Sequence, residues 1–121
     1  MNSLVMGFTF EGNNVEVLNL DGKVLFNPKD IGEILSMESS TTRKAMSKMN
    51  SNQVIKLKNS DVKDINIRKL NNAGENFITE SGVLQLIMRS NKPEAKKLKD
   101  WITDEVIPSI SKKGKYDLVE K

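Results

Sequence analysis

The first third of the chain follows the short hydrophobic period of β-strands. Apolar residues dominate positions 4–10, positions 15–20 partly alternate between apolar and polar, and positions 23–26 form a third short run. Turn-forming residues separate these runs at Glu11-Gly-Asn-Asn14 and at Asp21-Gly22, and the Asp-Gly pair is a strong signal for a two-residue hairpin. The pattern predicts an antiparallel β-meander of three strands.

Two short helices are predicted after the meander. Asn27 is a suitable N-cap for the first helix, and Pro28 fits its first position, where no backbone donor is needed. The second helix starts at Ser39-Ser-Thr-Thr42 and continues to Met49. Two short helices joined by a tight turn have helix-turn-helix geometry.

In this arrangement the second helix would expose hydroxyl and basic side chains and turn apolar ones inward. The exposed set would be Thr41, Thr42, Arg43, Lys44, Ser47 and Lys48, and the inward set Ala45, Met46 and Met49. Hydroxyls and cations suit contacts with phosphates, and an Arg can read guanine in the major groove. Short helix pairs are also common in proteins that never touch DNA, and Ser and Thr at a helix start are ordinary caps.

A second β-hairpin, rich in basic residues, is predicted next. Residues 53–58 and 65–70 both alternate, with Asn59-Ser-Asp61 as a turn between them. The basic residues of this segment are Lys56, Lys58, Lys63, Arg68 and Lys69. Such a hairpin is analogous to the wing of a winged-helix DNA-binding domain. Lysine on an edge hairpin also discourages sheet-to-sheet aggregation, which explains the same residues without DNA.

The stretch from Phe77 to Ile110 predicts a strand end followed by two helices and a tight turn between them. Thr79 is placed to cap the first helix, Asn91 and Pro93 mark the start of the second, and Pro108 should end or kink it. The apolar stripes contain Val83, Leu84, Ile87 and Met88 in the first helix and Ala95, Leu98, Trp101, Ile102 and Val106 in the second. We expect these stripes, including Met88 and Trp101, to lie in the core.

These elements predict an α+β fold with an N-terminal β-meander, a short helix pair, a basic β-hairpin and a C-terminal helical hairpin. A chain of 121 residues has room for one modest core. We expect one domain at residues 1–111 and a tail, or the start of a linker to a further domain, at residues 112–121. The sequence contains no apolar run near the ~20 residues of a membrane span and no secretory signal pattern, so we expect a cytoplasmic protein.

The amino-acid composition excludes several kinds of catalytic site. The chain contains neither Cys nor His, which excludes a Cys nucleophile, a Ser-His-Asp triad and a zinc site of the usual kind. We therefore expect no cofactor. A small enzyme that uses Lys29, Asp30 and Glu33 is a further hypothesis, because the two carboxylates share one helix face, although such pairs usually serve only solvation.

Charge is distributed unevenly along the chain. Residues 1–40 carry two cations and six anions, residues 41–72 carry eight cations and two anions, and the whole chain has a net charge of +3. A central basic block suggests a surface that faces a polyanion, although a solvated face of ordinary lysines gives the same pattern. Outside this block, Arg89 could cap its helix, pair with Asp104 or Glu105, or face DNA. For the lysines at 92, 96 and 99 we favour the interpretation that they only solvate a helix face.

Several of these segments resemble the Bro-N domain, in the order that family shows them. The similarity covers about residues 8–116 and is greatest from Ile78 to Ile110, through the predicted helical hairpin. Asn27-Pro-Lys-Asp-Ile-Gly-Glu-Ile-Leu35 is similar to a helix of that domain, and Thr42-Arg-Lys-Ala45 resembles the basic segment after it. Gly114-Lys-Tyr116 resembles the family's usual exit.

The resemblance implies a DNA-binding domain at the N-terminus of a phage or prophage antirepressor-type regulator. It implies no catalytic residues, and it favours a location in the bacterial host cell. Such a domain could instead be a protein-interaction module that binds a phage repressor without contacting DNA. A homodimer built on the helical hairpin is a further possibility. If DNA is the partner, the contacts should come from the second helix and from Lys56, Lys58, Arg68 and Lys69.

Overall fold

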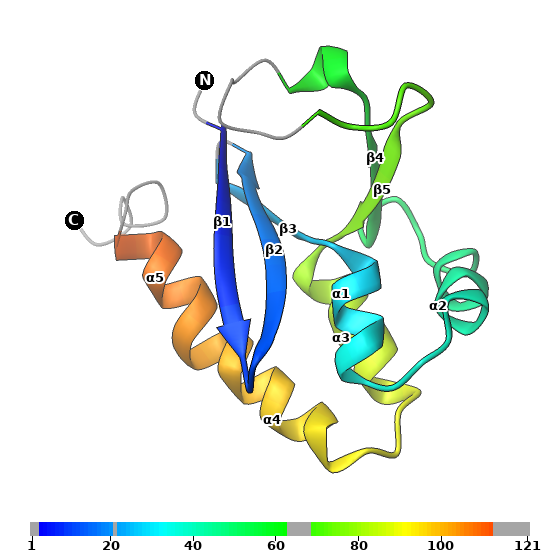
Figure 1. Ribbon diagram of the computed structural model, residues 1–121, viewed down its shortest axis with the longest axis vertical. Coiled ribbons are helices and arrows are strands. Elements are labelled where there is room, and N and C mark those ends of the chain that lie inside the picture. The colour runs from blue at the N-terminus through cyan, green and yellow to red at the C-terminus, as the bar shows by residue number, and fades with distance from the viewer. Residues whose placement is uncertain (1–2, 21, 63–68, 113–121) are drawn as a thin grey trace.

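A computed structural model describes residues 3–20, 22–62 and 69–112 (Figure 1). The strands are β1 (Ser3–Phe10), β2 (Asn13–Leu20), β3 (Lys23–Phe26), β4 (Val54–Leu57) and β5 (Glu75–Ile78). The helices are α1 (Pro28–Ile34), α2 (Ser39–Met46), α3 (Glu80–Met88), α4 (Pro93–Trp101) and α5 (Ile107–Lys112), with a 3-10 turn η1 (Asn59–Asp61) and a π-helical segment η2 (Ile102–Val106). The predicted α+β class is confirmed.

A single antiparallel sheet contains all five of these strands, in the order β1-β2-β3-β5-β4. The predicted meander forms its first half, and β1 and β2 turn at Glu11 and Gly12, where both φ angles are positive. A two-residue hairpin turn with this backbone matches the natural twist of the strands, and glycine adopts such angles without strain. Gly22 has a positive φ as well and donates its N–H to the Asn19 side chain at 2.9 Å.

β4 has a partner that the alternation does not predict, and the predicted hairpin with residues 65–70 stays a prediction. Among the described residues β4 pairs with β5, where Ile55 lies opposite Phe77. Most of the predicted partner, residues 65–70, lies outside the described residues. At its end, Leu70 is held by Asn59, whose side chain donates to the Leu70 carbonyl at 2.9 Å and accepts from the Leu70 N–H at 2.8 Å. Leu70 therefore anchors the connection between β4 and β5.

The sheet has a hydrophobic cluster on each face. The larger cluster joins one face of the sheet to the helices, and its central residues include Val17, Phe26 and Ile78. The smaller cluster lies on the opposite face and consists of Leu18, Leu25, Leu57, Leu70 and Phe77. Neighbouring residues of a strand point to opposite faces, so Leu18 and Val17 belong to different clusters. The connection after β4 covers the second face through Leu70.

Two of the three predicted N-cap residues are confirmed. Asn27 accepts the Lys29 N–H at 2.9 Å, and the Thr79 hydroxyl accepts the Gly82 N–H at 3.3 Å, as expected of N-caps. For α4 the prediction of Asn91 is wrong, because Lys92 is the N-cap residue. Pro93 occupies the first turn of α4 as predicted.

The helix does not end at Pro108, and such an end is one of the two outcomes that the sequence predicts for this proline. The helix continues past this proline to Lys112, after a widened segment in which the Ile107 N–H donates to the Ile102 carbonyl. A proline lacks the backbone N–H of a regular helix, and π-helical segments are one way in which a helix accommodates such an irregularity. No helix of the described residues is long and apolar enough to cross a membrane.

The core includes most of the predicted apolar stripes. Trp101 and its neighbours in the second stripe are buried, but Met88 is 75% exposed, so its prediction as a core residue is wrong. Leu86 is buried in the core from the same helix. Met88 is the last residue of α3, where the helix turns toward solvent before α4 begins.

Candidate nucleic-acid interface

α1 and α2 pack closely through two small residues. A Cβ atom placed on Gly32 of α1 would lie 2.7 Å from the Thr42 hydroxyl oxygen of α2, closer than real contacts allow. That hydroxyl donates to the carbonyl of Glu38, the N-cap residue of α2, at 3.3 Å. Thr42 is only 5% exposed. Its predicted place on the exposed face is therefore wrong, because α2 meets α1 at this residue.

The inward face of α2 otherwise follows the prediction. Ala45 is buried, and Met46 and Met49 are half-buried against the main core. With Thr42, these residues recur at the spacing of one helix face. The four contacts fix which way the rest of α2 must point.

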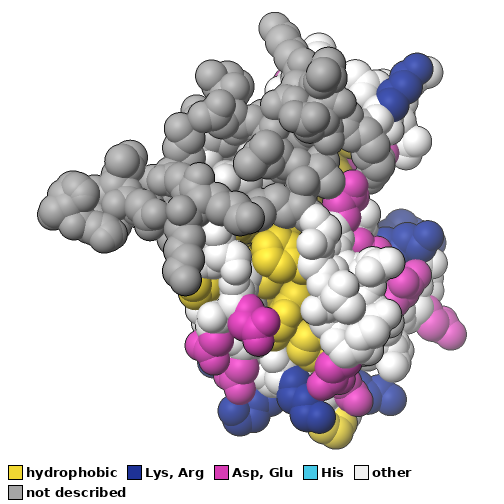
Figure 2. All heavy atoms as spheres, turned by 60° about the vertical axis from the view of Figure 1, so that its left-hand side comes forward, with side chains coloured by type: hydrophobic (Ala, Val, Ile, Leu, Met, Phe, Trp, Pro, Cys, Tyr) yellow, Lys and Arg dark blue, Asp and Glu magenta, His cyan; other side chains and the backbone are white. Residues whose placement is uncertain are grey.

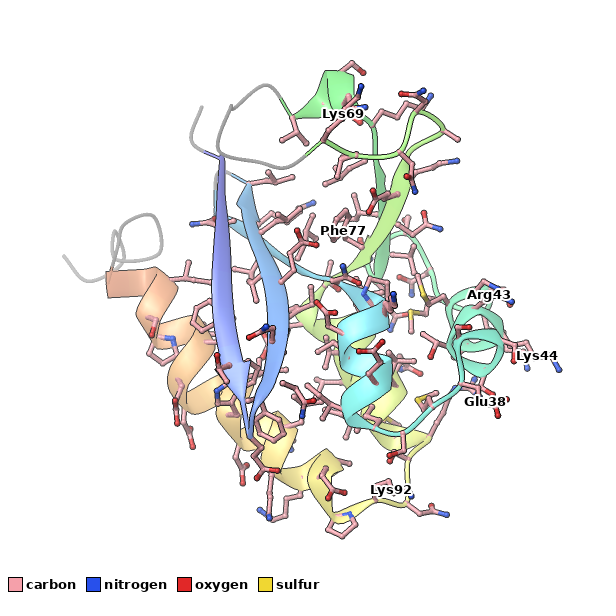
Figure 3. All side chains as sticks on the ribbon, in the orientation of Figure 1. Glu38, Arg43, Lys44, Lys69, Phe77 and Lys92 are labelled. Carbon is pink, nitrogen blue, oxygen red and sulfur yellow. The ribbon has the colours of Figure 1, made fainter. Side chains whose placement is uncertain are left out.

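The outward face of α2 carries the remaining predicted residues. Thr41, Arg43, Lys44, Ser47 and Lys48 are all exposed. Figure 3 shows that Arg43 and Lys44 point away from the body of the molecule. Both lie in the last turn of α2, where cations also offset the helix dipole. The Ser47 hydroxyl donates to the Lys44 carbonyl at 2.6 Å, so it contributes to the helix end.

A hollow between α1 and α2 adds a residue that the sequence analysis did not place in the site. It has a volume of about 420 Å³, and Lys29 and Arg43 both line it, together with Glu33, Met37, Ser39 and Thr42. Lys29 is exposed and extends the cationic surface from α2 onto α1. The sequence shows Lys29 beside a helix start, but only the packing of the two helices brings it to the hollow that Arg43 lines.

The other predicted basic residues lie on β4, directly after it, and in the connection to β5. Lys56 and Lys58 are exposed on and just after β4, and the Lys56 side chain passes close to Gly74. Lys69 is exposed too, but Figure 3 places it at the far end of the molecule from Arg43 and Lys44. Arg68 lies outside the described residues.

Asp30 has a structural role that bears on the enzyme hypothesis. Its carboxylate accepts the Glu16 N–H at 2.9 Å, and the Asn27 side chain donates to the Glu16 carboxylate at 2.9 Å, so the start of α1 is tied to β2. Partial burial raises the pKa of Asp30, and the nearby Glu16 and Glu33 charges act in the same direction. The described residues hold no group of three or more acidic residues that could bind a metal ion.

Arg89 is the C-cap residue of α3 and is exposed. Within the described part of the chain it forms no ion pair with Asp104 or Glu105, so this one of the three alternatives for Arg89 is wrong. Lys92, Lys96 and Lys99 are exposed as predicted, and Lys96 pairs with Asp100 at 3.2 Å.

Comparison with protein families decides which group the chain belongs to. The model of the BRO family N-terminal domain, Bro-N, matches residues 14–108. The chain belongs to the BRO family. The match runs from β2 through the helical hairpin, so the Bro-N domain includes the α1–α2 pair and the sheet behind it.

Curated relatives of this Bro-N chain come from viruses and from a bacterium. An uncharacterized Bro-N domain-containing protein, ORF2, of Autographa californica nuclear polyhedrosis virus is 55% identical over 34% of this chain and 12% of its own length. An uncharacterized protein of Haemophilus influenzae is 48% identical over 35% of this chain and 21% of its own length. An uncharacterized Bro-N domain-containing protein of Lymantria dispar multicapsid nuclear polyhedrosis virus is 50% identical over 34% and 10%.

The chain thus spans at most about a fifth of the length of these three relatives. Their names give no activity. No solved structure gives a significant match to the chain.

Proposed function

We propose that this Bro-N domain binds DNA through the outward face of α2, as a regulatory domain of a phage or prophage protein. The observation that carries the proposal is the orientation of α2. Its inward contacts through Thr42 and Ala45 leave Arg43, Lys44 and Lys48 exposed on a helix that stands at the edge of the molecule. Membership of the BRO family and the viral origin of two of the relatives support the same role.

The chemistry of this face suits a phosphate backbone. Arg43, Lys44 and Lys48 supply charge, and Thr41 supplies a hydroxyl on the same helix. Lys29 extends the cationic surface across the hollow between α1 and α2. Each phosphate neutralised by such a cation releases condensed counterions, so the affinity should fall steeply as salt is raised.

Lys56, Lys58 and Lys69 form a second basic group in the proposal. Figure 3 places Lys69 far from Arg43 and Lys44, so Lys69 would contact a different stretch of the DNA backbone, if DNA follows the right-hand side of Figure 3. Charge reversal in this group should then weaken binding without changing the sequence preference, because phosphate contacts carry little sequence information.

The test is a charge reversal on α2 with a matched control elsewhere. The variant is Arg43→Glu with Lys44→Glu, and the control is Lys92→Glu with Lys99→Glu, which makes the same change of charge on the exposed surface of α4. Figure 3 shows that Lys92 lies at the lower end of the molecule, away from α2. Fluorescence anisotropy on a labelled duplex at low salt would measure both affinities.

We expect the α2 variant to lose at least about a hundredfold in affinity and the control to lose severalfold at most. Circular dichroism should show that both variants remain folded. Equal losses in the two variants, or no binding of any duplex by the wild-type protein at low salt, would contradict the proposal. In that case a pull-down of a phage repressor after nuclease treatment tests the interaction-module alternative.

A further inference from the structure

A second surface lies on the opposite side of the molecule, between the tip of the β1–β2 hairpin and the α4–η2 helix. It is a hollow of about 450 Å³, called here the acidic hollow. Phe10 and Trp101 form its aromatic part, and it is also lined by four acidic residues, Glu11, Asp100, Asp104 and Glu105, and by Thr9 and Lys97. Figure 2 shows this side of the molecule, where hydrophobic side chains reach the surface in a strip between groups of acidic ones.

The aromatic part of the hollow is held in place by ring contacts. The Trp101 ring centroid lies 6.0 Å from that of Phe8, edge to face, and 5.2 Å from that of Phe10. Such pairs contribute stability beyond the area they bury. Trp101 is only 8% exposed, so the indole is fixed by the core rather than free to rearrange around a ligand.

The indole N–H of Trp101 makes no hydrogen bond with any described residue, although the side chain is more than nine-tenths buried. No fully buried side-chain nitrogen or oxygen among the described residues lacks a partner, so this N–H keeps some contact with the surface. The acidic hollow is a described surface depression that Trp101 lines. A fixed donor at such a place suits an acceptor supplied by a ligand.

The charges around the hollow are only partly compensated within the chain. Lys97 lies 3.8 Å from Glu11, and Lys96 lies 3.2 Å from Asp100. Asp104 and Glu105 form no ion pair with any described residue. Two uncompensated carboxylates therefore stand beside the aromatic part of the hollow, in a chain whose net charge is +3.

One chemical group satisfies all three features of the hollow. An Arg or Lys residue in a peptide offers a cation for the carboxylates, an aliphatic stem for the aromatic rings and a backbone carbonyl for the indole N–H. A bare metal ion would use only the carboxylates, and no acidic group in the described residues has the arrangement of a metal site. We propose that the acidic hollow docks a basic segment of a partner protein, with an Arg or Lys side chain held by Asp104 and Glu105.

Trp101 is the only tryptophan in the chain, so its fluorescence reports directly on the hollow. The probe is a capped octapeptide of alternating Arg and Gly, and the control probe replaces Arg by Glu. We expect a saturable change of Trp101 emission with the Arg peptide and none with the Glu peptide. Because the whole chain is cationic, general attraction for a polycation does not explain such binding.

A charge-reversal experiment tests whether the Arg peptide binds at the acidic hollow. Asp104→Lys with Glu105→Lys should weaken binding of the Arg peptide at least about tenfold. Glu33→Lys with Glu38→Lys makes the same change of charge on the side of the molecule that carries α2, and it should leave the affinity for the peptide unchanged. If the first variant melts early, Asp104→Asn with Glu105→Gln removes the charge with nearly the same shape, and a severalfold weakening is then expected.

Three results would overturn the inference. The first is no change of Trp101 emission with the Arg peptide. The second is equal affinity of the wild-type protein and the folded variants at positions 104 and 105. The third is a change of Trp101 emission that follows the protein concentration and not the peptide concentration, together with a dimer in sedimentation. A second copy of the chain would then be the occupant of the hollow. DNA affinity, measured in parallel, should be retained by the Asp104 and Glu105 variants, which separates this site from the proposed function.

Discussion

The two candidate surfaces belong to helices that meet the rest of the fold in different ways. α2 packs against α1 through Gly32 and Thr42, which is a local fit between two short helices. α4 is anchored by Trp101, whose ring packs against Phe8 and Phe10 at the other end of the chain. Both helices reach the main core, α2 through Ala45 and α4 through Trp101, but the basic face also depends on the close contact between α1 and α2.

The two surfaces also differ in the sign of their charge, so the net charge of the chain describes neither of them. The exposed cations of α2 and the acidic hollow, between the β1–β2 tip and α4, lie on different sides of the molecule (Figure 1). Two surfaces of opposite sign suit two different partners, a polyanion and a basic segment. Variants that damage one support should therefore affect the two surfaces unequally.

The largest effect is expected at the support of the acidic hollow. Trp101→Ala removes a buried aromatic side chain from the main core and should cost about 3–5 kcal/mol of unfolding free energy. Met88→Ala is the matched control, because Met88 is 75% exposed, and it should cost very little. Urea unfolding measures both. Similar losses in the two variants would show that Trp101 is no anchor.

A smaller and more local effect is expected at the support of α2. Gly32→Ala places a methyl group 2.7 Å from the Thr42 hydroxyl oxygen, and it should cost about 1–3 kcal/mol and weaken DNA binding. Adding Thr42→Ala removes the clashing atom and should restore part of both. Adding Thr42→Val keeps an atom at that place and should restore neither. Equal behaviour of the two double variants in thermal melts and DNA binding would contradict the account of this contact.

A substitution in the connection between β4 and β5 should lower stability without affecting α2 or α4. Asn59→Ala removes both hydrogen bonds to the Leu70 backbone and should cost about 1–2 kcal/mol. Asn72→Ala, on the exposed part of the same connection, should be close to neutral. Chemical denaturation gives the two costs, and binding of the Arg peptide should be the same in both variants. A loss of peptide binding in Asn59→Ala would show that this connection supports the hollow.

The smallest effect is expected from Asp30 and depends on pH. Because the folded state raises the pKa of Asp30, folding favours its protonated form, and its ionisation lowers stability as pH rises through the mildly acidic range above the ordinary aspartate pKa. Asp30→Asn keeps an acceptor for the Glu16 N–H and should reduce this fall. Thermal melts across the acidic range would measure it. An unchanged pH dependence in the variant would contradict the burial of this carboxyl.

The elements that the sequence predicted well are those that local chemistry defines. The β1–β2 turn, the Asn27 and Thr79 caps and the Pro93 start of α4 depend on residues within a few positions of one another. The buried stripe around Trp101 also follows from spacing alone. Local patterns of this kind were sufficient to predict the α+β fold class.

The features that the sequence did not predict depend on contacts between distant segments. Thr42 is a good residue for an exposed helix start, and only the approach of Gly32 makes it a buried contact. β4 pairs with β5 across a long connection, and the alternation of apolar and polar residues within a strand does not indicate which strand is its partner. The acidic hollow requires the β1–β2 hairpin to lie against α4 and η2, so its residues come from both ends of the chain.

The most direct test of the central claim is the salt dependence of duplex binding, measured for the wild-type protein and for Arg43→Glu with Lys44→Glu. If the outward face of α2 binds phosphates, the wild-type affinity falls steeply with salt, and the residual binding of the variant has a slope that is smaller by about two units in log affinity against log salt. The charge reversal at Asp104 and Glu105 should leave the slope no smaller than that of the wild-type protein. A wild-type affinity that does not change with salt, or a slope that both reversals reduce alike, would contradict the assignment of DNA binding to α2.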